Sequence, residues 1–157
     1  MVHILPARLH RALMPLAHRA RVNWLKMRGK SFAGVSAVVT NLNGDVLLLR
    51  HSYGAPVWAL PGGGLKSGEE PEEILRREMQ EELGIELGKV AELGTIEEQL
   101  FGCPHTAHLF AAKCNARPRP DQREVTEARF FPSHSLPEPL SEVTRKRIEM
   151  WRTRGLD

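Results

Sequence analysis

The chain has 157 residues, of which 41% are hydrophobic and 26% are charged, a composition typical of a globular protein rather than a disordered or fibrous one. This length predicts one compact domain with little left over. No stretch approaches the roughly 20 consecutive apolar residues that cross a bilayer, which excludes a membrane-spanning protein. The two cysteines, Cys103 and Cys114, are too few for a disulfide framework, and we expect reduced thiols in a cytoplasmic protein.

The net charge of +3 conceals an uneven distribution along the chain. Residues 1–44 hold seven of the 22 Lys and Arg residues and none of the 19 Asp and Glu residues, so this segment carries +7 and the rest carries −4. Its basic residues are Arg8, Arg11, Arg19, Arg21, Lys26, Arg28 and Lys30. Because the acidic body has no comparable basic stripe, RNA is disfavoured as the main partner, although it stays open as an alternative.

Residues 1–30 predict a basic, amphipathic helical leader that precedes the main domain. Pro6 suits a first helical turn, whereas Pro15 predicts a kink or break near the middle. Three uses stay open for the leader: a cap on the core or on the partner of a homodimer, a peripheral contact with an anionic membrane surface, and a targeting address. Apolar residues recur at spacings of three and four, on one face, at Leu5, Leu9, Ala12, Leu13, Leu16, Ala17, Ala20 and Trp24.

The main domain, residues 31–157, alternates short strand patterns with two amphipathic helices. This order predicts an α/β (α+β) fold, an α/β/α sandwich with a mixed β-sheet. Asn41 to Gly44 form a turn that joins two antiparallel strands, and Gly62 and Gly63 belong to a loop without side chains. Strands are expected at residues 32–40, 45–50, 90–98, 106–114 and 124–131, a loop at 61–64, and helices at 70–83 and 140–153.

The helix expected at residues 70–83 brings together three acidic side chains. Glu78, Glu81 and Glu82 fall within roughly a 100° arc of the helix surface, beside an apolar stripe. Like charges at these spacings repel each other by a few tenths of a kcal/mol, and by more where they are partly buried. The stripe consists of Leu75, Met79 and Leu83.

A solvated, ion-paired helix face is the alternative interpretation of these acids. It suits the first turns, where Arg76 and Arg77 follow glutamates by four positions, at Glu72 and Glu73. Arg77 can also reach Glu81. Neither Glu78 nor Glu82 has a basic residue four positions away, so this side of the helix requires a cation from elsewhere. Carboxylate oxygens favour Mg²⁺, or Mn²⁺ as a substitute, over zinc.

This segment resembles a complete Nudix box. Gly63, Glu69 and the run from Arg77 to Ile85, which reads REMQEELGI, fill every fixed position of that family's 23-residue signature. The wider resemblance extends over about residues 32–131, and residues 1–30 lie outside it. It implies an α/β/α sandwich that hydrolyses a nucleoside diphosphate linked to another group, with water attacking one phosphorus of the pyrophosphate and with Mg²⁺ or Mn²⁺ as cofactor.

The resemblance also implies roles for residues of the box. Glu78, Glu81 and Glu82 would be metal-binding carboxylates, with Glu82 the most critical, and the Gly63 carbonyl would be a further metal ligand. Glu69 and Arg77 would orient these acids. Gly62 and Gly63 would let the substrate phosphates approach the backbone closely.

Other candidate residues lie outside the box. Glu124 precedes a strand much as a catalytic glutamate does in some bacterial RNA pyrophosphohydrolases, and a solvated loop acid is the alternative. Arg50 is a candidate ligand for a substrate phosphate, with a surface role as the alternative. Trp58 and Phe101 are interpreted as core residues rather than as platforms for a base.

The expected function is hydrolysis of a nucleotide-type substrate such as ADP-ribose or a nucleotide sugar. Positions 100–103 hold neither the Tyr of diadenosine polyphosphate hydrolases nor the Pro of many ADP-ribose hydrolases, so the substrate stays open. Removal of pyrophosphate from nucleoside triphosphates or from the 5′ end of RNA is an alternative. A non-catalytic, nucleotide-binding sensor is an alternative of another class.

Overall fold

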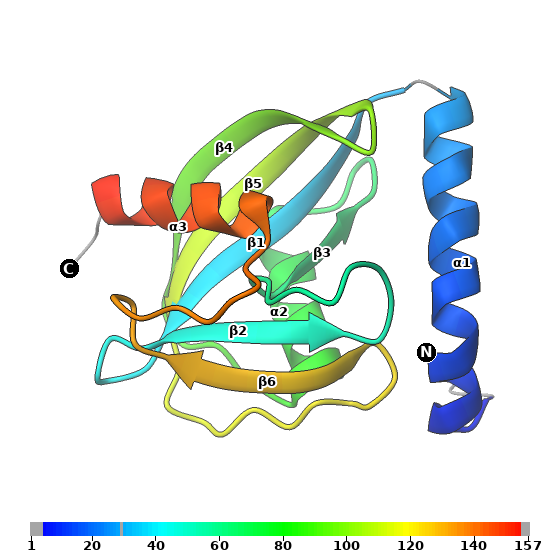
Figure 1. Cartoon of the computed structure of the whole chain (residues 1–157). Coiled ribbons are helices and arrows are strands. Elements are labelled where there is room, and N and C mark those ends of the chain that lie inside the picture. Colours follow the sequence, from blue (N-terminus) through cyan, green and yellow to red (C-terminus); the bar gives the residue numbers. More distant parts are fainter. Residues whose placement is uncertain (1–4, 29, 155–157) are drawn as a thin grey trace.

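A computed structural model describes residues 5–28 and 30–154 of the chain (Figure 1). Among these residues, no helix is both long enough and apolar enough to span a membrane. The elements, in chain order, are α1 (Ala7–Arg28), β1 (Phe32–Thr40), β2 (Val46–His51), β3 (Gly62–Leu65), α2 (Pro71–Leu83), β4 (Val90–Leu100), β5 (Cys103–Lys113), β6 (Val125–Phe131) and α3 (Glu142–Thr153).

The strands form one mixed sheet in the order β4-β5-β1-β2-β6, with β3 paired to β1 beside this path. Strands β1 and β5 run parallel, and the other neighbours run antiparallel. Strand β2 pairs with the end of β1, through Val46 and Thr40, whereas β3 pairs with its beginning. The first half of β1 therefore pairs with β3, which we call the glycine strand because three of its four residues are glycine.

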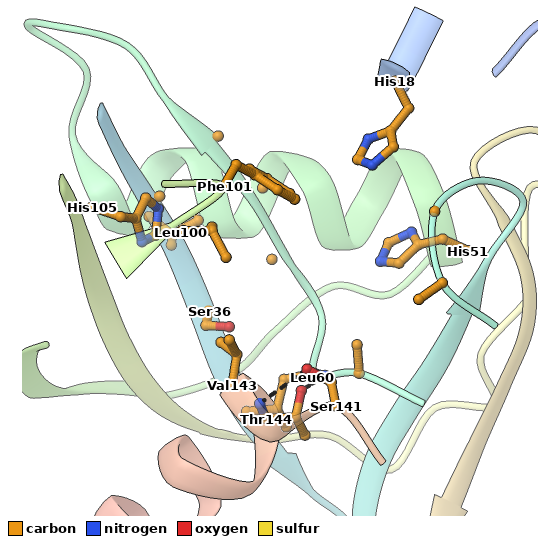
Figure 2. Close-up of a pocket in the computed structure, with 18 of the residues that line it drawn as sticks. His18, Ser36, His51, Leu60, Leu100, Phe101, His105, Ser141, Val143 and Thr144 are labelled. Carbon is orange, nitrogen blue, oxygen red and sulfur yellow. Dashed lines mark hydrogen bonds between the residues drawn. The ribbon is translucent and has the colours of Figure 1, made fainter. Parts of the chain in front are cut away.

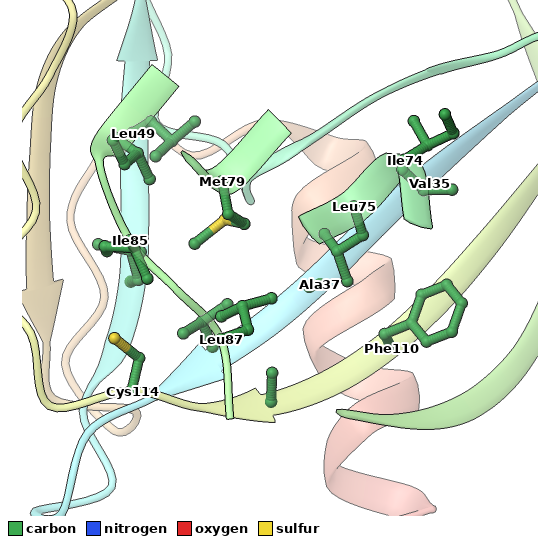
Figure 3. Packing of buried hydrophobic residues seen from close by; sticks show 14 of the residues in the cluster. Val35, Ala37, Leu49, Ile74, Leu75, Met79, Ile85, Leu87, Phe110 and Cys114 are labelled. Atoms are coloured by element: carbon green, nitrogen blue, oxygen red, sulfur yellow. The ribbon is translucent and has the colours of Figure 1, made fainter. Parts of the chain in front are cut away.

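The sheet separates two hydrophobic clusters, and one helix covers each face (Figure 1). Alternation along β1 directs Val35, Ala37 and Val39 into the cluster that includes α2, shown in Figure 3, while Val38 joins the cluster that includes Ile148 of α3. The predicted α/β/α sandwich with a mixed sheet is confirmed.

Local signals explain the ends of the predicted turn and helix. The side chain of Asn41 accepts hydrogen bonds from the backbone N–H groups of Asn43 (3.0 Å) and Asp45 (2.9 Å), and this closes the turn between β1 and β2. Helix α2 begins after Glu70 with Pro71 in its first turn. It ends at Gly84, whose φ of 64° is the left-handed conformation that glycine adopts without strain.

Two predictions about the backbone are wrong. Residues 62–64, expected as a loop, belong to strand β3, because a Cβ on Gly62 would lie only 2.1 Å from the carbonyl oxygen of Val35 and its absence lets the strands pair. Helix α1 continues through Pro15 without a break. Pro15 is exposed, so water can hydrogen-bond the carbonyl group that proline leaves without a donor.

Helix α1 lies along one side of the sandwich (Figure 1). Its partly buried side chains include Met14, His18 and Val22, which face the rest of the chain. The predicted apolar face points away from the core, and Leu16 on that face is 68% exposed. The expectation that this face caps the core of the same chain is therefore wrong. The division at residue 30 stays a prediction.

Candidate active site

Helix α2 presents its carboxylates to three different environments. Glu82 adjoins the apolar stripe and is buried, with only 6% of its surface exposed. Glu78 is half-buried, and Glu81 is exposed. The stripe itself is buried as predicted, at Leu75, Met79 and Leu83.

Glu124 reaches helix α2 because its loop is bound to the end of that helix. The backbone N–H of Asp121 donates to the carbonyl oxygen of Glu82 at 2.9 Å. The carboxylate of Asp121 in turn accepts backbone hydrogen bonds from the residues that follow, including Glu124 at 3.1 Å. The loop thus supplies a donor to the last turn of the helix and fixes Glu124 beside Glu82.

The carboxylates of Glu78, Glu82 and Glu124 form one electrostatic unit. Burial, followed by the charges of Glu78 and Glu124, raises the pKa of Glu82 from its ordinary value of 4.5 to about 10. Burial also raises the pKa of Glu78. The nearby carboxyl groups of Glu78 and Glu124 favour the protonated form of Glu82, which has one O–H group to donate. Without a cation, the three groups cannot all ionise at low cost.

The oxygen-rich donor set fits a hard divalent cation. Within residues 5–28 and 30–154, no group of three or more His, Cys, Asp or Glu side chains is already arranged in metal-binding geometry. The raised pKa values of Glu78 and Glu82 have the same cause, which is crowding of carboxylates away from water, and a bound cation would remove it.

Glycine residues make room for this unit. A Cβ on Gly63 would lie 2.9 Å from the Cγ atom of Glu78, so only glycine allows this approach without a shift of Glu78. The carbonyl oxygen of Gly63 lies 3.0 Å from the position that a Cβ on Gly34 would occupy. The two glycines therefore keep both the carboxylate and the carbonyl oxygen uncrowded.

Arg77 links the beginning of the box to its glutamates. Its Nη1 atom lies 3.8 Å from Oε2 of Glu69, and its Nη2 atom lies 3.6 Å from Oε1 of Glu78. Glu69 also accepts a hydrogen bond from the backbone N–H of Lys66 at 3.1 Å, which fixes its carboxylate. This geometry suits the orienting roles that the resemblance implies for Glu69 and Arg77.

The ion pairs of α2 differ in part from the prediction. Arg76 pairs with Glu72 at 2.9 Å, as its spacing predicts. Among the described residues, Arg77 pairs with neither Glu73 nor Glu81, and the two predicted pairs are wrong. Arg77 turns instead toward the carboxylates of Glu69 and Glu78, which are the less exposed partners.

The side chain of Arg50 already contacts other side chains of the protein. Its Nη1 atom lies 3.7 Å from Oε1 of Glu127, and its guanidinium carbon lies 4.6 Å from the ring centroid of Trp58. Arg50 is not among the residues that line the pocket beside Gly63. Its role as a phosphate ligand stays a prediction, for which this geometry gives no support.

The two aromatic residues of interest have different surroundings. Trp58 is buried and packs edge-on against Phe131, with ring centroids 4.9 Å apart, so its interpretation as a core residue is confirmed. Phe101 lies at the turn between β4 and β5 with a φ of 53°, and 37% of its surface is exposed. Interpreting Phe101 as core was wrong, because the turn directs its ring to the pocket.

A pocket of about 420 Å³ opens beside Gly63. Figure 2 shows His18, His51 and Phe101 on one side of the pocket, and Ser36 and Thr144 on the other. Tyr53 also lines the pocket, and its pKa is raised by burial and then by the charges of Glu124, Glu82 and Glu78. Gly63 lines the pocket and lies against Glu78, whereas Glu78, Glu82 and Glu124 themselves are not among the lining residues. The contribution of Tyr53 to the pocket was not predicted from the sequence.

A buried polar network forms one wall of this pocket. Arg147 of α3 binds Glu98 of β4 through Nη2 at 2.6 Å and donates from Nη1 to Oγ of Ser36 at 3.0 Å. The Nδ1 atom of His105 lies 2.9 Å from the same Glu98 oxygen. The sequence carries no local signal for this network, because its members come from four separate elements.

A known protein family matches the segment of the chain that contains these site residues. Residues 30–151 match the NUDIX domain family. The chain belongs to the NUDIX family. The matched segment includes the whole predicted box, β3 and most of α3, so the resemblance expected from the sequence is confirmed, and so is the predicted class of a Nudix hydrolase domain. Members of this family generally use divalent metal ions.

The individual proteins that this chain resembles are named for different hydrolase activities. An RNA pyrophosphohydrolase of Tolumonas auensis is 43% identical over 61 residues, which are 39% of this chain and 34% of that protein. The chain spans about a third of the length of the curated relatives that it matches. The crystal structure of a MutT NUDIX hydrolase from Burkholderia pseudomallei has a TM-score of 0.70 and 28% identity, covering 77% of this chain and 98% of that one. A UDP-X diphosphatase has a TM-score of 0.68 and 27% identity, covering 87% of this chain and 70% of that one.

Proposed function

We propose that this protein is a divalent-metal-dependent pyrophosphohydrolase that cleaves a nucleoside diphosphate linked to another group, as in ADP-ribose or a nucleotide sugar. One observation carries the proposal: Glu78, Glu82 and Glu124 interact electrostatically, and Glu78 lies against Gly63, which lines a pocket. A pyrophosphate is anionic and repels its nucleophile, so a site for its hydrolysis requires carboxylates that gather cations next to an open backbone.

Glu78, Glu81, Glu82 and the carbonyl oxygen of Gly63 would hold the ion, with Mg²⁺ as the proposed cofactor and Mn²⁺ as a substitute. A bound ion of this kind neutralises phosphate charge and lowers the pKa of the attacking water. Arg77 holds Glu78 in place through the 3.6 Å contact. Gly62 and Gly63 leave the backbone of β3 accessible to the phosphates.

Glu124 is the proposed general base. It is adjacent to Glu82 but belongs to a different segment, and its loop is fixed by Asp121. A base within hydrogen-bond reach of the attacking water must be held in this way, because its position decides whether the proton can be transferred. In this role, the carboxylate of Glu124 would accept the proton of the attacking water.

The pocket supports a small nucleotide as the substrate. Its volume of about 420 Å³ lies within the range of small-molecule sites, and its opening carries the rings of His18, Tyr53 and Phe101. Such rings pack well against a base or ribose. The likeness to a UDP-X diphosphatase supports the same substrate class. We also propose a cytoplasmic location, where the buried Cys103 and Cys114 would stay reduced.

Hydrolysis of nucleoside triphosphates or of a 5′-triphosphate RNA is the second candidate. It is favoured by the curated relatives, since the matches at 43% identity over 61 and 51 residues are named RNA pyrophosphohydrolases. An RNA substrate predicts binding that weakens steeply with salt, because each phosphate contact releases counterions.

A panel hydrolysis assay tests the proposal. The panel contains ADP-ribose, nucleotide sugars, dinucleotide polyphosphates, nucleoside triphosphates and a 5′-triphosphate RNA, each with Mg²⁺ or Mn²⁺ and with chromatographic separation of products. We expect metal-dependent cleavage of a nucleoside diphosphate derivative by the wild type and its loss in Glu82→Gln. Cleavage of the triphosphates or RNA alone would favour the second candidate. Nucleotide binding without any turnover would identify a non-catalytic sensor and contradict both.

A further inference from the structure

We propose that helix α1 is part of the substrate site and that its Arg21 binds a phosphate of the substrate. This inference rests on the proposed function and extends it to a segment outside the Nudix box. Three features carry it: the position of Arg21 against β3, the position of His18 at the opening of the pocket, and the attachment of α1 to the loop of Glu124.

Arg21 lies directly against the glycine strand. Its Nη2 atom is 2.9 Å from the position that a Cβ on Gly64 would occupy, and Arg21 lines the pocket beside Gly63. Gly63, the next residue along β3, contacts Glu78. Because successive residues of a strand point to opposite faces, the guanidinium group of Arg21 and the carboxylate of Glu78 flank this short strand from its two sides. A phosphate bound in the pocket beside Gly64 would be within reach of Arg21.

The charge of Arg21 is available to a ligand. Within the part of the chain that the structure describes, Arg21 forms no ion pair and no hydrogen bond, whereas Arg11 on the same helix donates to the side chain of Gln122 at 3.4 Å. Arg21 and Glu124 act on Tyr53 with opposite effects on its pKa, so both groups lie within electrostatic range of that tyrosine. Arginine suits a phosphate because its planar group donates two parallel hydrogen bonds.

His18 closes the opening of the pocket from the same helix. Its ring centroid lies 5.1 Å from that of Tyr53 and 5.8 Å from that of Phe101, and Figure 2 shows the ring on the same side of the pocket as His51. Burial, and then the charge of Arg21, lowers the pKa of His18. A largely neutral ring at neutral pH adds aromatic surface for a base or ribose.

The loop that positions Glu124 also holds α1. Arg123 donates from Nη1 to the carbonyl oxygen of Leu5 at 2.7 Å, and Arg11 donates to Gln122. Both partners belong to the turn that Asp121 organises through its backbone hydrogen bonds. The same loop therefore binds helix α1 and carries the proposed base, and it fixes the position of α1 relative to the site.

Three variants on the surface of α1 test this inference. Arg21→Ala removes the cation, Arg21→Lys keeps the charge without the planar group, and Arg19→Ala is the control because Arg19 is an exposed arginine that does not line the pocket. The readouts are kcat and KM for the best substrate of the panel and the dissociation constant of ADP, measured by calorimetry with Mg²⁺. Circular dichroism verifies that each variant folds.

We expect Arg21→Ala to raise KM and the ADP dissociation constant by about 10- to 100-fold, the effect of one lost hydrogen bond to a charged group, with kcat nearly unchanged. Arg21→Lys should recover part of the loss, and Arg19→Ala should match the wild type. Equal KM and equal ADP affinity in Arg21→Ala and wild type would overturn the inference while leaving the proposed function intact. A wild type that neither hydrolyses the panel nor binds ADP would overturn both.

Discussion

The carboxyl group of Glu82, on helix α2, lies near that of Glu124, which directly precedes strand β6, and the charge of Glu124 helps to raise the pKa of Glu82. Two acids from separate segments adopt this contact because the loop of Asp121 is bound to the end of the helix. The contact is unfavourable when both groups are ionised. By holding these two carboxyl groups together, the fold creates a place where a cation can bind.

The crowding of Glu82 predicts how stability changes with pH when metal is absent. The pKa of Glu82 is about 10 in the folded chain against an ordinary 4.5, so the folded state binds the proton more tightly than the unfolded state. The stability contributed by this proton is fully present below about pH 4.5 and is lost as the pH rises toward 10. The slope is at most about 1.4 kcal/mol per pH unit.

Glu82→Gln should therefore be more stable than the wild type at pH 8 in EDTA, as measured by urea unfolding. Glu73→Gln is the control, because Glu73 is exposed on the same helix. Addition of Mg²⁺ should stabilise the wild type and leave Glu82→Gln almost unchanged. A Glu82→Gln variant that is less stable than the wild type in EDTA at pH 8 would show that the carboxylates are not under this strain.

Gly63→Ala should impair hydrolysis without unfolding the chain. The added Cβ would meet the Cγ atom of Glu78 at 2.9 Å, and the flexible side chain of Glu78 can move aside. Because a displacement of about 1 Å at a catalytic group costs up to roughly 100-fold in rate, we expect kcat/KM to fall by at least about tenfold. Gly88→Ala, where the nearest atom is 3.9 Å away, is the matched control. Equal activity of both variants would refute a close contact of β3 with Glu78.

Arg147→Ala should destabilise the fold far more than Arg145→Ala, although both arginines lie on α3. Arg147 and Glu98 form a pair with side chains only 12% and 13% exposed, and removal of the arginine leaves a buried carboxylate with His105 as its remaining partner. We expect a loss of about 3–5 kcal/mol in the free energy of unfolding. Loss of the exposed pair of Arg145 with Glu138 should have little effect on the free energy of unfolding. Similar losses in urea unfolding for the two variants would contradict the buried network.

The sequence predicts the parts of the fold that local signals specify. The stripe of Leu75, Met79 and Leu83 and the terminal Gly84 lie within one helix, so periodicity and capping were sufficient to locate α2. The position of Gly62–Leu65 in a strand was missed, because glycine has little strand preference and the pairing depends on the missing Cβ atoms.

For the site too, the sequence predicts the parts that local signals specify and misses the contacts between distant segments. The box glutamates follow from their spacing, whereas the approach of Glu124 depends on a loop that folds back onto α2. The orientation of α1 was also missed. Its most apolar face was expected to pack inward, but the contacts that hold the helix are made by Arg11 and His18, on its opposite face. Tertiary hydrogen bonds and ring contacts decide this orientation, and neither leaves a periodic pattern.

The outward face of α1 makes a prediction of its own. Replacement of Leu13 and Leu16 together by Ser should change the free energy of unfolding by no more than about 0.5 kcal/mol at each site, because both side chains are exposed. In contrast, Leu75→Ala should cost about 2–5 kcal/mol. If this face joins two copies or contacts an anionic membrane, the same double variant should lose the dimer in sedimentation or the binding to acidic vesicles. A large loss of stability in the double variant would show that the face packs within the chain.

Binding of Mn²⁺, followed by electron paramagnetic resonance, tests the central claim most directly, because it requires no knowledge of the substrate. The carboxylate unit predicts that the wild type binds Mn²⁺, that Glu82→Gln binds it at least about tenfold more weakly, and that Glu73→Gln binds it as the wild type does. Equal Mn²⁺ affinity in the wild type and Glu82→Gln would contradict the assignment of this unit as the metal site.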